Sequence, residues 1–192
     1  MQLANAALVV VDVQVAFDDL HYWSPTGRRN NPDCEANVAA LISAWREHGR
    51  PRVYVRHDSD EDDSPLRPDR PGNALRDFVS GEPDLLVTKQ VNSAFYGDPD
   101  LHAWLQERGI GTLVLCGVQT NHCVETTARM GANLGYDVAF VLDACWTYDR
   151  EGPDGEVMSA DELTRATATS LHEEFATIVS TADLVGATAA PR

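Results

Sequence analysis

Basic residues are scarce in this sequence. Lysine and arginine together number 15 against 30 aspartates and glutamates, which gives the 192-residue chain a formal net charge of −15 at pH 7. A protein that binds the phosphate backbone of a nucleic acid needs a basic face that displaces counterions. An anionic membrane surface is an equally poor partner for an acidic chain. The composition therefore argues against nucleic acid and membrane as partners and indicates solubility rather than a particular substrate.

Long apolar runs and paired cysteines are also missing. The first apolar run, residues 6–11, is too short for the core of a signal peptide or for a membrane span. The 4 cysteines form no C-x-x-C pair and are sparse for the chain length. We therefore expect reduced thiols in a cytoplasmic protein.

Two common ligand-binding motifs are absent as well. No G-x-G-x-x-G follows the first apolar segment, where residues 14–17 read Gln-Val-Ala-Phe, so a dinucleotide-dependent oxidoreductase is disfavoured. The acidic run at residues 58–62 imitates the start of a calcium loop, but Asp63 stands where that loop requires glycine. We interpret this run as a solvated acidic loop.

Strand and helix patterns alternate along the whole chain. Apolar segments typical of buried strands lie at residues 7–13, 53–55, 85–87, 112–116, 137–142 and 175–179. Helical patterns lie between them, at residues 32–49, 74–79, 98–109, 121 onward and 159–171. This alternation predicts an α/β protein with three αβα layers around a central, mainly parallel six-stranded sheet. Without a repeat or a linker, residues 1–192 are expected to form a single domain.

Three polar residues follow predicted strands at the edge where parallel sheets bind ligands. Asp12 lies near the end of the first strand, Lys89 directly follows the third, and Cys123 follows the fourth in the first turn of a helix. Alone, Asp12 is equally well explained by a helix cap or a buried salt bridge, and Lys89 by a solvated loop charge. Their shared position favours a functional site.

The segments around these residues are distinctive. They read Ala-Leu-Val-Val-Val-Asp-Val-Gln-x-x-Phe at residues 7–17, Thr-Lys-x-x-x-Ser-Ala-Phe at residues 88–95, and Gly-Val-Gln-Thr-Asn-His-Cys-Val-Glu-Thr-Thr-Ala-Arg at residues 117–129. In order and spacing the chain resembles the isochorismatase-like cysteine hydrolases over roughly residues 6–180. That superfamily includes nicotinamidases, N-carbamoylsarcosine amidases and ureidoacrylate amidohydrolases.

The resemblance implies a role for each matching residue. Cys123 would be the nucleophile, Asp12 the general acid and base, and Lys89 their cationic partner. A non-proline cis peptide bond would join Val118 to Gln119 and place the amide N–H of Gln119 beside that of Cys123 as an oxyanion hole. The family's members are generally homo-oligomers, so we expect one here.

These residue types predict hydrolysis of a C–N bond through a thioester. A thiolate would attack the carbonyl of a small amide, carbamoyl compound or lactam, and Asp12 would pass the thiol proton to the leaving nitrogen. The helix N-terminus and Lys89 are expected to lower the pKa of Cys123, while ionised Asp12 opposes that shift. Cys34 and Cys116 are expected to be buried; for Cys145 the sequence leaves the question open.

Other candidate site residues have weaker signals. Phe17, Phe95, Tyr96 and Trp146 are candidates for the walls of the substrate pocket, although each is equally compatible with an ordinary core position. His122 precedes the nucleophile, but neighbouring side chains on a helix diverge by about 100°, so we interpret it as structural.

The alternatives concern metal and catalysis. Nicotinamidases bind a metal through an aspartate and several histidines after the second strand, where this sequence offers His57 and Asp58 and no further histidine before His102. We therefore expect no metal and no cofactor. A metal-dependent nicotinamidase and a non-catalytic small-molecule-binding homologue remain the alternatives. Release of ammonia from amides would distinguish an enzyme from the non-catalytic homologue.

Overall fold

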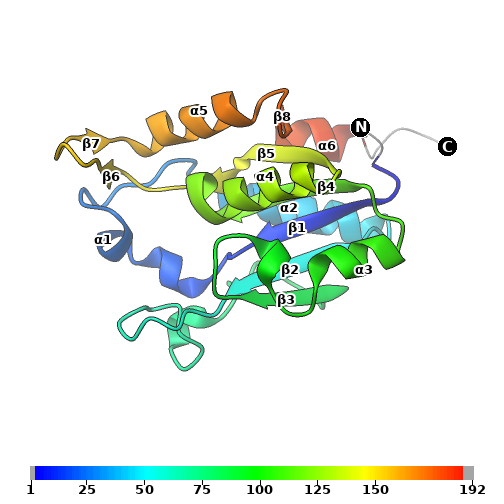
Figure 1. Ribbon diagram of the computed structural model, residues 1–192, viewed down its shortest axis with the longest axis horizontal. Coiled ribbons are helices and arrows are strands. Elements are labelled where there is room, and N and C mark those ends of the chain that lie inside the picture. The colour runs from blue at the N-terminus through cyan, green and yellow to red at the C-terminus, as the bar shows by residue number, and fades with distance from the viewer. Residues whose placement is uncertain (1–2, 188–192) are drawn as a thin grey trace.

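The computed structural model describes residues 3–187 (Figure 1). The predicted domain, residues 1–192, also includes residues 1–2 and 188–192, which lie outside the described residues. Within the described range no helix has both the length and the apolar character needed to cross a membrane.

Six parallel strands form the central sheet, as the alternating pattern predicts. In chain order they are β1 (Ala6–Val11), β2 (Arg52–His57), β3 (Leu85–Lys89), β4 (Thr112–Val118), β5 (Asp137–Trp146) and β8 (Thr177–Val179). Across the sheet they are arranged β3-β2-β1-β4-β5-β8. All six residues of β1 are buried, because helices cover both faces of the sheet.

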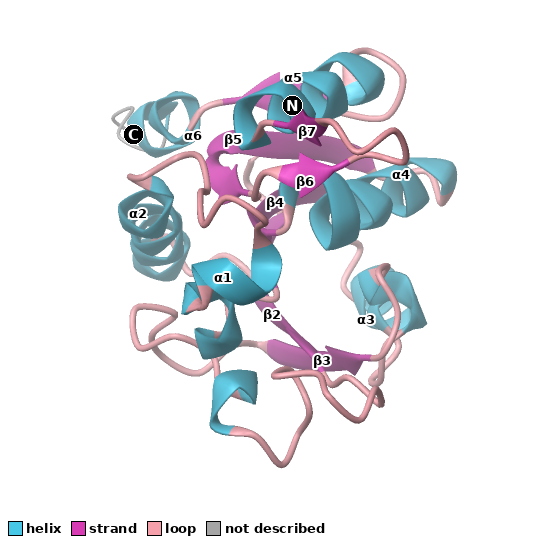
Figure 2. Cartoon of the chain, turned by 90° about the vertical axis from the view of Figure 1, so that its left-hand side faces the viewer, coloured by secondary structure: helices cyan, strands magenta, loops and turns pink. Residues whose placement is uncertain are grey.

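Helices form a layer on each side of the sheet (Figure 2). One layer contains α2 (Cys34–Glu47) and α6 (Thr181–Ala187); the other contains α3 (Leu101–Glu107), α4 (Glu125–Asn133) and α5 (Ala160–Leu171). The predicted capping box is present, since Ser159 and Glu162 exchange hydrogen bonds at the start of α5. The three-layer αβα architecture is therefore confirmed.

Short elements fill the connections. They are η1 (Val15–Asp18), α1 (Leu20–Trp23), η2 (Pro71–Asn73), η3 (Ala94–Tyr96), the π-helical turn η4 (Thr120–Val124), and the antiparallel ribbon of β6 (Arg150–Glu151) and β7 (Val157–Met158). In Figure 1 the segment with α1 and the loop after β2 both lie on the left of the sheet, beyond the carboxyl end of β1.

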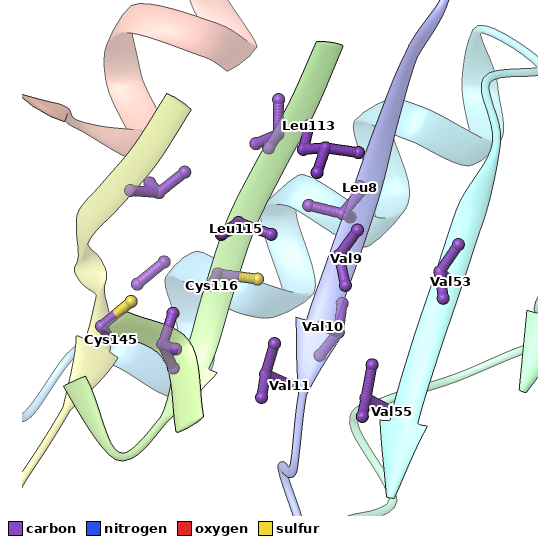
Figure 3. Packing of buried hydrophobic residues seen from close by; sticks show 14 of the residues in the cluster. Leu8, Val9, Val10, Val11, Val53, Val55, Leu113, Leu115, Cys116 and Cys145 are labelled. Atoms are coloured by element: carbon purple, nitrogen blue, oxygen red, sulfur yellow. The ribbon is translucent and has the colours of Figure 1, made fainter. Parts of the chain in front are cut away.

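The core lies between the central strands and the helices. Leu8, Val9, Val10 and Val11 pack beside side chains of β2 and β4 (Figure 3). Fully burying an aliphatic side chain of this size contributes about 1.5–3 kcal/mol, so these strands supply much of the stability. This packing fixes the carboxyl ends of the strands, which carry the polar residues.

The segment at residues 74–79 is not the brief helix that the sequence predicts. The amide N–H of Val15 donates to the carbonyl of Ala74, and that of Arg76 donates to the carbonyl of Val13. Residues 74–76 are therefore extended and pair with residues that follow β1, and residues 77–79 form a turn. This long-range pairing overrides the local helical preference.

The strand order reverses between β1 and β4, whose flanking connections lie on opposite faces of the sheet. Such a switch point opens a crevice beyond the carboxyl ends of the strands. Gly117 faces Val11 across these two strands, with a φ of 126°, and an added Cβ would lie 2.0 Å from the Val11 carbonyl oxygen. Only glycine permits this close approach, which brings the turn after β4 beside the residue after β1.

Candidate active site

Lys89, the last residue of β3, is surrounded by three acceptors. Its Nζ lies 2.5 Å from Oδ2 of Asp12, 3.0 Å from Nδ1 of His57 and 3.4 Å from Sγ of Cys123. The side chains of Lys89 and Asp12 are fully buried. The three hydrogens of the ammonium therefore match three partners from three parts of the chain. Lys89 is also the only lysine in the sequence.

Asp12 follows β1 in an unusual backbone conformation. Its φ of 52° lies in the left-handed region, which side chains other than those of glycine, asparagine and aspartate rarely adopt. Strained residues of this kind cluster at functional sites. While Oδ2 accepts from Lys89, Oδ1 is buried and has no hydrogen-bond partner within residues 3–187. One carboxylate oxygen is thus left available to a ligand.

Cys123 lies in the turn η4, just before α4. Besides Lys89, two polar groups lie near its Sγ: Oδ1 of Asn92, which accepts from the thiol at 3.8 Å, and the carboxylate of Asp12, within 4.8 Å. The peptide bond between Val118 and Gln119, at the start of this turn, is cis. The turn therefore places the thiol beside the ion pair of Asp12 and Lys89.

Burial and charge set the protonation states in this cluster. Burial and the charge of Asp12 raise the pKa of Cys123, and the opposing effect of Lys89 is smaller. The pKa of Lys89 is raised as well, because Asp12 and Cys123 outweigh the effect of its burial. The thiol therefore rests protonated beside an Asp12–Lys89 ion pair. This corrects our expectation of a lowered pKa for Cys123, which did not account for burial.

His57 completes the surroundings of Lys89. Burial lowers the pKa of His57, and the neighbouring ammonium lowers it further. Because an ammonium can only donate, Nδ1 of His57 accepts from Lys89 and the ring proton lies on Nε2. Gln14 fixes the backbone here by donating to the His57 carbonyl at 3.0 Å and accepting from the His57 amide at 2.8 Å. A neutral, oriented imidazole results.

A small cavity opens onto these residues. Its volume is about 240 Å³, and Asp12, Gln119 and Cys123 line it. The remaining lining residues come from the segment after β1, from the loops after β2 and β3, and from η4: Phe17, Trp23, His57, Ser59, Asp60, Glu61, Ser64, Leu66, Gln90, Asn92 and His122. The cavity has room for a compact small molecule rather than a polymer.

Comparison with known proteins identifies the family. The family model described as the isochorismatase domain matches residues 6–183. The chain belongs to the isochorismatase family. The predicted resemblance is thereby confirmed over nearly the whole chain.

Relatives within the isochorismatase family match over most of their length. The uncharacterized family protein YrdC of Bacillus subtilis (strain 168) is 37% identical over 180 residues, which cover 93% of this chain and 94% of YrdC. A crystal structure of an isochorismatase-family protein from Chromobacterium violaceum superposes with a TM-score of 0.90 at 37% identity, covering 98% of this chain and 95% of that one. A cysteine hydrolase from Pseudomonas syringae pv. phaseolicola superposes with a TM-score of 0.83 at 25% identity, covering 98% and 94%. The chain is thus an isochorismatase-family hydrolase.

Only one of the four predicted pocket aromatics lines this cavity. Phe17 does so and stacks on Trp23 with ring centroids 4.6 Å apart. Trp146 is fully buried and donates to the Tyr148 hydroxyl. Trp146 is therefore a core residue, which corrects its assignment to the pocket wall.

The other two aromatics also lie elsewhere. Phe95 stacks on Tyr136 with ring centroids 5.8 Å apart, and Tyr96 is 69% exposed. Tyr96 lines an adjoining groove beside β3, which shares Gln90 and Asn92 with the cavity but is not lined by Cys123. The assignment of both to the pocket is likewise corrected. Conversely, His122 lines the cavity, although the sequence analysis interpreted it as structural.

The residues present do not fit a metal ion well. Ligand atoms of Asp12, His57 and Cys123 lie within 4.8 Å of one another, which is a plausible spacing for a metal site. The Lys89 ammonium, however, contacts all three of these groups and takes the place of a cation among them. The carboxylate of Asp58 is bound instead by Arg56. The donor set therefore favours a resident ammonium over a divalent cation.

Iodoacetamide is expected to modify Cys123 first, because Cys34, Cys116 and Cys145 are fully buried. Since burial and Asp12 raise the pKa of Cys123, the labelling rate should climb about tenfold per pH unit between pH 7 and 9. Peptide mapping after substoichiometric labelling, with residual activity measured in parallel, checks this. A rate that levels off below pH 7, or a first label on Cys145, would contradict it.

Proposed function

We propose that this isochorismatase-family protein is a metal-independent cysteine amidohydrolase that cleaves the C–N bond of a small amide, carbamoyl compound or lactam. The observation behind the proposal is the buried cluster in which the Lys89 ammonium contacts both the Asp12 carboxylate and the Cys123 thiol. The cavity beside that cluster supplies the space for a small substrate.

Acylation begins with the resting thiol. Asp12 accepts the proton from Sγ of Cys123 as the sulfur bonds to the substrate carbonyl carbon, and the carbonyl oxygen becomes an oxyanion. The backbone N–H groups of Gln119 and Cys123 would stabilise that oxyanion. Protonated Asp12 then donates to the nitrogen as the C–N bond breaks. Ammonia or an amine departs, or, from a lactam, the freed amine stays attached to the acyl group, and a thioester on Cys123 remains.

Deacylation reverses these roles. Asp12 accepts a proton from a water molecule whose oxygen attacks the thioester carbon. The C–S bond breaks, the carboxylic acid leaves, and the proton returns to Sγ of Cys123. One water is consumed for each C–N bond cleaved, and no oxidant or cofactor is needed.

Lys89 and His57 keep this sequence electrostatically feasible. Asp12 alternates between a carboxylate and a neutral acid, and the sulfur becomes negative as the C–S bond breaks. The Lys89 ammonium lies within hydrogen-bond distance of both groups, so it stabilises negative charge on either of them. His57 accepts the third hydrogen of Lys89 and so restricts its rotation. Both residues would act by placing one positive charge between the two reacting groups.

Release of product amine tests the proposal. The purified protein is incubated with a panel of small amides, carbamoyl compounds and lactams, and ammonia or amine is quantified together with the acid. Acid quenching during turnover should reveal the mass of an acyl group on the peptide that contains Cys123. Turnover without any acyl-enzyme, or no turnover across the whole panel, would overturn the proposal and favour a binding homologue.

Chelation should leave the activity unchanged. Since Lys89 occupies the position between the possible ligands Asp12, His57 and Cys123, we expect kcat and KM to survive exhaustive dialysis against EDTA. Metal analysis of the dialysed protein serves as the control. Activity that disappears and returns with zinc, iron or manganese would instead support a metal-dependent nicotinamidase.

A further inference from the structure

Two carboxylates line the same cavity as Cys123. Asp60 and Glu61 belong to the acidic run after β2, and both contribute to the cavity wall. Neither forms an ion pair with a basic residue in the described part of the chain, whereas Asp58 and Asp62 of the same run pair with Arg56 and Arg67. The run that the sequence presented as a solvated acidic loop therefore directs two unpaired negative charges to the candidate site.

Unsatisfied acceptors occur deeper in the cavity. Gln119 is only 4% exposed and lines the cavity, and its Oε1 is buried without a hydrogen-bond partner among the described residues. Oδ1 of Asp12 is in the same situation. Buried acceptors without partners are costly, so a bound molecule that donates hydrogen bonds would relieve this cost. The cavity thus favours a ligand rich in N–H groups.

The nearby basic groups do not neutralise the negative charges of Asp60 and Glu61 at the cavity. Lys89 is engaged by Asp12, His57 and Cys123, so its charge is neutralised locally. Burial, and to a smaller extent the charge of Arg150, lowers the pKa of His122, but Arg150 is not among the residues that line the cavity. The aromatic ring of Trp23, which does line it, also attracts cations.

We propose that the substrate is an amide or lactam that carries a cationic group, such as an ammonium or guanidinium. The cation would bind Asp60 and Glu61 while the carbonyl carbon lies at Cys123 and the N–H groups of the amide donate to Gln119. This inference rests on the proposed amidohydrolase function and adds to it the charge of the substrate. Anionic amides would be disfavoured by the same carboxylates.

Matched substrates test the charge preference. We compare 4-aminobutanamide, which is cationic, with neutral pentanamide and anionic succinamate, all of similar length. The expected order of kcat/KM follows charge, with the cation first. In the double variant Asp60→Asn/Glu61→Gln the preference for the cation should fall about tenfold or more, mainly through KM, because charge-assisted hydrogen bonds to it are lost.

The control variant changes the net charge of the same loop by the same amount, at positions that do not line the cavity. Asp62→Asn/Asp63→Asn also removes two carboxylates, but neither residue lines the cavity. It should keep the wild-type preference. Equal kcat/KM for the three amides, or equal losses in both double variants, would overturn the inference while leaving the amidohydrolase function intact.

A binding measurement tests the cation site independently of amide hydrolysis. In Cys123→Ala protein labelled with [ζ-¹⁵N]lysine, Lys89 gives the single lysine Nζ signal, because the sequence contains no other lysine. Titration with 4-aminobutanamide should shift this signal at concentrations at least about tenfold lower than pentanamide requires. That difference should disappear when Asp60→Asn/Glu61→Gln is added. Equal binding of the two amides would refute the cation site whether or not any amide is hydrolysed.

Discussion

Replacing Cys123 by alanine is expected to reduce kcat by a factor on the order of 10⁶, since loss of a nucleophile removes the covalent pathway entirely. The fold should persist, because the side chain borders the cavity and the substitution removes a single heavy atom. Steady-state kinetics on a substrate found in the amide panel measure the effect. Thermal unfolding checks that the variant is folded.

Binding in the same variant sharpens this test. Substrate should still bind to Cys123→Ala with an affinity near that of the wild type, since the contacts to the rest of the molecule remain. The acyl-enzyme mass found with wild type should be absent. Substantial residual turnover in Cys123→Ala would rule out the thiol as nucleophile.

Asp12→Asn is expected to lower kcat by about 10²–10⁴-fold, the usual contribution of a general acid and base. Asparagine keeps the shape of the side chain but can neither accept the thiol proton nor donate one to the leaving nitrogen. It also leaves the Lys89 ammonium buried without its countercharge. Breaking such a buried pair costs about 3–5 kcal/mol, so the free energy of unfolding should fall as well.

A double variant distinguishes lost chemistry from lost stability. Asp12→Asn/Lys89→Met replaces the ion pair by neutral groups of similar volume, and the free energy of unfolding should recover most of what the single variant loses. Activity should not recover. Retention by the single variant of more than about a tenth of the wild-type kcat would exclude Asp12 as the proton carrier.

The positions of the three cluster residues could be predicted from sequence because parallel strands impose a common direction. Asp12 and Cys123 follow strands and Lys89 ends one, and the carboxyl ends of parallel strands meet at one edge of the sheet. The apolar strand patterns are local and strong, so that edge can be located without the structure. The element at residues 74–79 could not be predicted, because its hydrogen bonds go to residues far away in the chain.

The cavity wall was harder to predict than the cluster. Whether an aromatic side chain faces a cavity or the core depends on which neighbours cover it, and sequence spacing does not contain that information. Trp146 is thus buried in the core while Phe17 lines the cavity. His57 had a visible signal as the histidine that follows the predicted second strand, but its contact with Lys89 emerges only when β2 and β3 pair.

The sequence by itself determined the family, the parallel sheet and the identity of the polar residues at its edge, because these depend on residue type and on regular spacing along the chain. The tertiary structure alone decided the protonation of Cys123, the position of Lys89 among three acceptors, and the presence of Asp60 and Glu61 at the cavity. These properties depend on burial and on distances of a few ångströms between residues remote in sequence. Electrostatic energies change steeply over such distances, and only the folded chain fixes them.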